Sequence, residues 1–185
     1  AEEEMIEQAF QELLNDYLAT KHRKRVEIIT KAFNFANQAH KGIKRRSGEP
    51  YIMHPIAVAK IVCNEIGLGS TSICSALLHD VVEDSELTLD ELRGRGVDED
   101  VLAALRLLTH AKTEDYFDYV RRIAASGNTT AIHVKMNDLR HNLERGLRTY
   151  AQAVEDGDTE KAECLARIND KHRKALQIFE DCGLL

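Results

Sequence analysis

Histidine and acidic side chains are concentrated in three short segments of the sequence. The most crowded is HDVVED at 79–84, which directly follows the apolar residues 76–78. The other two are YIMHP, which contains His54, and KMNDLRHN, which contains Asp138. Like charges that are partly buried destabilise a protein unless a positive group lies among them. A metal ion bound among the three segments would supply that positive charge.

The donor atoms in these segments indicate which kind of ion would fit. Imidazoles together with carboxylates form a mixed nitrogen and oxygen site, which suits Mn²⁺, Fe²⁺ or Zn²⁺. The adjacent pair His79-Asp80 at a helix end can direct two ligands at one ion, and further ligands must come from distant parts of the chain. Taken singly, each segment also has a plainer interpretation: a helix cap at His54, a chance pair at His79-Asp80 and a solvated helix face around Asp138.

The elements that must position these residues are helices. Apolar residues recur at helical spacing through most of the chain, and no convincing run of alternating strands appears. Segment 41–53 contains Gly, Ser and Pro and predicts a loop, and Pro55 fits the first turn of the next helix, with His54 as its cap. We predict an all-α fold, a compact globular bundle of about eight to ten helices. The expected helices are 5–18, 20–42 with Thr20 as its cap, 54–67, 70–84, a short helix from the capping box of Thr88 and Glu91, 101–108, 116–125, 130–143 and 159–181.

Length and composition limit the classes of function. The 185 residues predict one domain, 1–185, and the net charge of −6 argues against a general nucleic-acid surface. The 4 cysteines form no CxxC pair, so we expect free thiols in a reducing compartment rather than a thiolate zinc site. No stretch approaches the roughly 20 apolar residues of a membrane helix. We therefore expect no membrane partner and a cytoplasmic location, while the oligomeric state is left open.

Three motifs, in this order, resemble those of a known family. They are HKGIKRRSGEPYIMHP at 40–55, ALLHDVVED at 76–84 and KMNDLRHN at 135–142. The set is similar to the HD superfamily of metal-dependent phosphohydrolases. It is closest to the hydrolase domain of the Rel/SpoT alarmone enzymes and to the small alarmone hydrolases. The resemblance is dense up to HDVVED and weaker beyond it.

The resemblance implies roles for particular residues. The metal ligands would be His54, His79, Asp80 and Asp138, with Mn²⁺ as the family's usual ion. Glu83 and Asp84 match the family's catalytic acidic pair. Arg45 and Ser47 match residues that contact the guanosine nucleotide, and Asn142 matches the asparagine that holds its sugar.

Elementary helix geometry agrees with these implied roles. If residues 79–84 remain helical, Glu83 lies one turn beyond His79 and Asp84 one turn beyond Asp80, so the two pairs share a face. Either carboxylate could then orient a water molecule or carry its proton. The basic residues of 41–46 could bind an anionic substrate, because Arg offers paired donors to phosphate and a flat face to a base. Without the motifs, the same charges would equally fit an ordinary solvated loop.

We therefore expect a Mn²⁺-dependent hydrolase. It would remove the 3′-pyrophosphate from guanosine 3′,5′-bis(diphosphate) (ppGpp) or the corresponding pentaphosphate (pppGpp), giving GDP or GTP and pyrophosphate. The alternatives are an HD-type phosphohydrolase for another nucleotide and a non-catalytic nucleotide-binding HD domain. Because 185 residues leave no room for a synthetase region, we expect no alarmone synthesis.

Several residues near the motifs remain open to more than one interpretation. Asn137 replaces the family's alanine and could alter hydrogen bonding around Asp138. Lys135 could contact phosphate or be solvated. His110 and His133 read as structural or surface residues, and His141 is ambiguous.

Overall fold

The computed structural model describes all 185 residues, and the chain folds into ten α-helices and one π-helical segment without any strand. The predicted all-α class and the expected number of helices are confirmed. The elements are α1 (Glu2–Leu18), α2 (Val26–Ala39), α3 (Met53–Ile61), η1 (Val62–Ile66), α4 (Ser70–Leu78), α5 (Val81–Asp84), α6 (Leu89–Gly94), α7 (Glu99–Leu108), α8 (Tyr116–Ala124), α9 (Thr129–Glu155) and α10 (Thr159–Asp181).

Helix α4 lies at the centre of the bundle. It packs against α2, α3, α7 and α9, and each of its residues from Ser72 to Leu78 is buried. A helix that is surrounded on all sides must be apolar or small on all sides, which this stretch, SICSALL, satisfies. The same central position places the end of α4, where the HDVVED segment begins, inside the protein.

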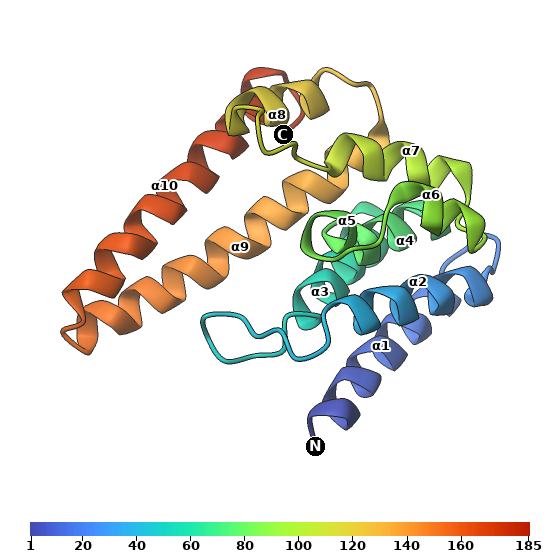
Figure 1. Cartoon of the computed structure of the whole chain (residues 1–185), viewed down its shortest axis with the longest axis horizontal. Helices are drawn as coiled ribbons and strands as arrows, with labels where there is room; N and C mark the ends of the chain where they lie inside the picture. The colour runs from blue at the N-terminus through green and yellow to red at the C-terminus, as the bar shows by residue number, and fades with distance from the viewer.

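Helices α9 and α10 form a long antiparallel pair that extends well beyond the bundle (Figure 1). Asn128 and Asp158 cap their N-termini, each through a side-chain oxygen that accepts from a backbone N–H. The outer part of the pair has its own small apolar cluster, formed by Ala153, Ala162 and Leu165. The pair therefore reaches past the core and forms one wall of a cleft.

Segment 41–53 forms the opposite wall of this cleft. It is folded as a tight hairpin-like loop beneath α9 (Figure 1). The backbone N–H of Arg45 donates to Glu49 O, and that of Tyr51 donates to Ile43 O, both at 2.8 Å. Gly48 sits at the bend with φ of +87°, a conformation that side chains with a Cβ rarely adopt. These contacts give the loop a defined shape.

Some expected helix limits are wrong, each for a local reason. Helix α2 begins at Val26 after Arg25, and the Thr20 hydroxyl instead donates to Tyr17 O at the end of α1. His54 lies inside the first turn of α3 rather than at its cap, which is Ile52. The cap at Thr88 is confirmed, since its hydroxyl accepts from the Glu91 N–H.

Two further differences concern the site itself. The helix expected at 130–143 runs on to Glu155, because α10 packs along its whole outer part. The helix expected at 70–84 breaks at His79 and Asp80, which form a turn between α4 and α5.

None of the helices combines the length and the apolar character that crossing a bilayer requires.

Candidate metal centre and cleft

Three separate parts of the chain bring four side chains together. His54 comes from the first turn of α3, His79 and Asp80 from the turn after α4, and Asp138 from the middle of α9. One ligand atom from each of the four lies within 4.8 Å of all the others. The Nε2 atom of His54 lies 2.7 Å from Asp138 Oδ1, and that of His79 lies 3.0 Å from Asp80 Oδ2. The structure thus brings together the four residues singled out from the sequence.

The break between α4 and α5 sets the direction of the His79 ring. Its Nδ1 lies 2.6 Å from Ala76 O, and because a carbonyl only accepts, Nδ1 carries the proton. The Nε2 atom therefore faces the cluster, 3.3 Å from Asp138 Oδ1. Ending the helix at Leu78 turns two consecutive side chains, His79 and Asp80, toward the same point.

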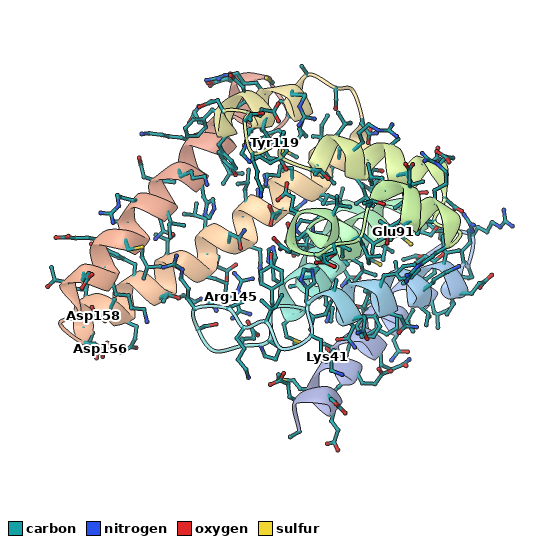
Figure 2. All side chains as sticks on the ribbon, viewed as in Figure 1. Lys41, Glu91, Tyr119, Arg145, Asp156 and Asp158 are labelled. Atoms are coloured by element: carbon teal, nitrogen blue, oxygen red, sulfur yellow. The ribbon has the colours of Figure 1, made fainter.

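An outer layer of side chains holds the carboxylates. Lys135 Nζ donates to Asp138 Oδ2 at 3.1 Å, while the Asn142 amide donates to Asp138 Oδ1 at 3.2 Å. The Tyr51 hydroxyl donates to Asp80 Oδ2. Lys135 is itself buried. Its ammonium lies 5.1 Å from the ring centre of Tyr119 on α8, the residue labelled in Figure 2. Lys135 is thus neither solvated nor free for phosphate, which settles the open question of its environment.

The charges in the cluster shift one another strongly. Burial alone would raise the pKa of Asp138, but Lys135 and His79 outweigh it and hold that pKa well below the usual range. Burial would likewise lower the pKa of His79, but Asp80 and Asp138 raise it well above normal. For His54 burial dominates and lowers the pKa, so its ring is neutral. The buried carboxylates are therefore ionised and paired.

The residues fit a divalent ion by their donor chemistry. Two imidazole nitrogens and two carboxylate oxygens converge, and the side chains of His54, His79 and Asp138 are almost completely buried. That mixed set suits borderline ions such as Mn²⁺, Fe²⁺ or Zn²⁺. The outer contacts described above are the kind that orient metal ligands. No thiol takes part, and all four cysteines of the chain are free.

The two acidic residues expected to act in catalysis differ in their surroundings. Glu83 Oε1 accepts from the backbone N–H of His110, which ties α5 to the segment before α8. The side chain of Asp84 is exposed and makes no hydrogen bond within the protein. Partial loss of hydration, together with the charges of Asp80 and Glu83, raises the pKa of Asp84 to about 6. Asp84 is therefore the carboxylate with a free face and a proton affinity near that of a working base.

A cleft of about 710 Å³ opens beside the cluster, between segment 41–53 and the α9–α10 pair. Arg45, Ser47 and Asn142, the three residues expected to contact substrate, all line it. Arg45 donates to the Asn142 amide oxygen at 3.0 Å, which links the loop to α9. Tyr51 and Asn142 line the cleft and also bind Asp80 and Asp138, so the cleft ends at the cluster.

The cleft is strongly basic in an acidic protein. No acidic residue lines it, whereas its lining includes Lys44, Arg45, Arg46, Arg145, Arg148 and Lys161. Arg145 projects from α9 toward the loop, where it pairs with Glu49 at 3.3 Å (Figure 2). Such a surface favours a ligand with several negative charges.

Sequence reasoning missed Tyr51 and the outer part of α9. Residues 145, 146, 149 and 152 continue the cleft lining from Asn142 at helical spacing, and all four lie beyond the expected helix end at 143. His172 of α10 also lines the cleft, with a buried Nδ1 that has no partner. The late helix thus contributes to the cleft through residues that the motifs do not include.

Two further expectations can be compared with the structure. Asn137 is buried, but its amide donates to His133 O at 2.8 Å, so it does not touch the cluster and the expected effect on Asp138 is wrong. His110 contacts Glu114 O through its ring and lies outside the cluster, as does His133.

Comparison with known proteins places these features in a family. The family model described as HD domain matches residues 32–143. A guanosine-3′,5′-bis(diphosphate) 3′-pyrophosphohydrolase from Aquifex aeolicus is 38% identical over 90 residues, which are 49% of this chain and 12% of the relative. A probable enzyme of the same name from Synechocystis is 32% identical over 124 residues, 63% of this chain and 16% of the relative. A probable GTP pyrophosphokinase from Mycobacterium leprae is 49% identical over 67 residues, 36% of this chain and 8% of the relative.

The chain therefore spans only a small part of the length of these curated relatives. Among solved structures, a metazoan ortholog of SpoT described as hydrolysing ppGpp superposes with a TM-score of 0.61. It is 22% identical, and the match covers 89% of this chain and 100% of the other, so it shares the fold. Because the HD domain match covers more than half of its residues, with all four clustered side chains inside it, this chain belongs to the HD domain family.

Proposed function

We propose that residues 1–185 form one metal-dependent hydrolase domain that removes the 3′-pyrophosphate of ppGpp or pppGpp, giving GDP or GTP and pyrophosphate. The observation that carries the proposal is the convergence of two histidines and two aspartates at the end of a basic cleft. The names of two relatives, from Aquifex aeolicus and Synechocystis, support the same substrate.

In this proposal His54, His79, Asp80 and Asp138 hold Mn²⁺. A divalent ion of this class acts as a Lewis acid and makes water acidic enough to react near neutral pH. Asp84 takes the proton of the attacking water through its free carboxylate, and Glu83 fixes the position of α5 through its bond to His110. Water attacks phosphorus, the bond to the ribose 3′ oxygen breaks, and that oxygen leaves as a hydroxyl after gaining a proton.

The cleft residues bind and orient the nucleotide. Arg45 presents a planar guanidinium that can stack on a purine or pair with phosphate, and Ser47 lies beside it on the loop. Asn142 spans the gap between Arg45 and Asp138, so it can place the sugar next to the cluster. We place the reaction in the cytoplasm, because four free thiols are typical of a reducing compartment.

The test is incubation of the purified chain with ppGpp and Mn²⁺, with products separated and identified. We expect GDP and pyrophosphate from the unaltered chain and from Arg93→Ala, a surface control whose partner Glu99 is exposed. We expect no turnover from His79→Ala. Metal-loaded protein that releases no pyrophosphate would refute the proposed substrate. Orthophosphate released from another nucleotide would instead support the alternative phosphohydrolase, and binding without turnover would support the non-catalytic alternative.

A further inference from the structure

The ring nitrogen of His54 that points away from the cluster, Nδ1, has an unusual partner. Its Nδ1 lies 2.7 Å from Nδ1 of His141, and the two rings are nearly parallel, with an interplanar angle of 24°. Both rings are buried, and His141 lies one helical turn beyond Asp138 on α9. The equivalent nitrogen of His79 faces a backbone carbonyl instead. The two clustered histidines therefore have outer partners of different chemistry.

That difference decides which tautomer each ring can adopt. A carbonyl only accepts, so it fixes the proton of His79 on Nδ1. An imidazole nitrogen can donate or accept, so the His54–His141 bond survives with the proton on either side. Where the carboxylate of Asp138 accepts from His54 Nε2, the Nδ1 of His54 carries no proton, so His141 donates to it.

Metal binding requires the opposite arrangement. A ligand nitrogen carries no proton, so His54 must then hold its proton on Nδ1 and donate it to His141. The number of protons on the pair stays the same: His54 releases its Nε2 proton to solvent and gains the shared proton on Nδ1, and His141 takes up one proton from solvent on its own Nε2. The Nε2 atom of His141 has no hydrogen-bond partner within the protein and is accessible to solvent, so water can deliver the proton.

We propose that His141 is a positioning residue for the metal site, which keeps His54 oriented and hydrogen-bonded in both tautomers. The inference rests on the proposed metal site and adds a residue to it. The observations that carry it are the short Nδ1–Nδ1 contact, the burial of both rings and the single carboxylate oxygen shared by His54 and His79. Loss of an outer partner of a metal-bound histidine typically weakens metal affinity by about 10–100-fold.

The first experiment measures Mn²⁺ affinity by calorimetry on the full chain. We expect His141→Leu to bind about 10–100-fold more weakly than the unaltered chain, and His141→Asn to recover most of the loss, because an amide can also accept or donate at that point. The matched control is His133→Leu, which removes an imidazole from the same helix away from the cluster and should leave the affinity unchanged.

The second experiment reads the tautomers directly from the imidazole ¹H–¹⁵N correlations of the unaltered chain. We expect His54 to carry its proton on Nε2 without metal and on Nδ1 with Zn²⁺ as the diamagnetic probe. Equal Mn²⁺ affinity for His141→Leu, or an unprotonated His54 Nδ1 in the Zn²⁺ form, overturns the inference. If His141→Leu does not fold, His141→Asn and the spectra decide. Failure of the unaltered chain to bind any divalent ion would refute the proposed metal site itself.

Discussion

At Gly146, α9 lies close to Asn169 of α10 beside the cleft. A Cβ built at Gly146 would lie 2.0 Å from Asn169 Oδ1 and 3.1 Å from its Cγ. Ordinary carbon–oxygen contacts need more than 3 Å, and Asn169 is only 2% exposed, so its side chain has little room to retreat. Gly146→Ala should therefore force α10 away from α9 or drive Asn169 into a strained rotamer.

The sign of the effect depends on two opposing terms. Overpacking of a buried contact costs about 1–3 kcal/mol, whereas alanine in place of glycine inside a helix stabilises by about 1 kcal/mol. We expect Gly146→Ala alone to lower the free energy of unfolding by about 0–2 kcal/mol. In an Asn169→Ala background the obstructing amide is gone, so the same substitution should raise the free energy of unfolding by up to about 1 kcal/mol.

Urea denaturation of the four chains, all without metal, measures this coupling as a double-mutant cycle. The expected coupling energy is about 1–3 kcal/mol, with the larger value if α10 cannot move. Gly146 lines the cleft, so Gly146→Ala should also weaken binding of the proposed nucleotide. A Gly146→Ala chain that is more stable by the same amount in both backgrounds would show that the helices are not in contact here, and would refute the reasoning.

Three other predictions follow from buried groups. Lys135→Met removes the ammonium that pairs with Asp138 Oδ2. Without metal, its free energy of unfolding in urea should therefore be about 3–5 kcal/mol lower than that of the unaltered chain. A decrease below about 1 kcal/mol would contradict the pairing. His79 has a raised pKa and must be neutral to bind an ion, so Mn²⁺ should displace its proton. The affinity for Mn²⁺ should then fall by up to about tenfold for each pH unit below that pKa. Calorimetry in buffers of different ionisation enthalpy measures the proton release, and finding none would contradict the prediction. Burial raises the pKa of the Cys74 thiol to about 12, so a thiol reagent at pH 8 should modify the exposed Cys182 rapidly and Cys74 only after unfolding, a difference that peptide mapping would show or deny.

The sequence was most informative where side-chain period and local chemistry agree. Apolar residues at helical spacing predicted nearly every helix, and the Thr88 cap was visible because capping is a contact between near neighbours. The predicted end of α9 was wrong because it depends on packing against α10, and the predicted start of α2 was wrong because the Thr20 hydroxyl bonds to the end of α1 instead. Nothing local stops α9 at 143 or continues it to Glu155; its outer part is held by the apolar contacts with α10.

The clustered residues were predictable from the motifs, but their surroundings were not. The resemblance of the motifs to the HD superfamily implied His54, His79, Asp80 and Asp138, and the structure brings these four together. The contacts of Lys135, Tyr51 and His141 join positions that lie far apart in the chain or depend on rotamers, so spacing alone could not assign them. For Asn137 the sequence suggested an effect that the structure does not show. Its neighbour Asp138 lies in the cluster, but the Asn137 amide donates to His133 O of the same helix.

The charge balance explains why the cluster can exist before an ion binds and why it then favours an anion. In the metal-free protein two carboxylates, Asp80 and Asp138, face the charges of Lys135 and a protonated His79, so the buried group is close to neutral. Replacing one proton by a divalent ion leaves one net positive charge at the end of a cleft that already lacks acidic residues. Since a buried unpaired charge is costly, that excess is best relieved by a phosphate group entering from the cleft. Substrate and ion should therefore bind more tightly together than separately. The positive charge of Lys135 is the reason for this mutual enhancement. In Lys135→Met the metal-loaded cluster would be neutral, so the enhancement should largely disappear.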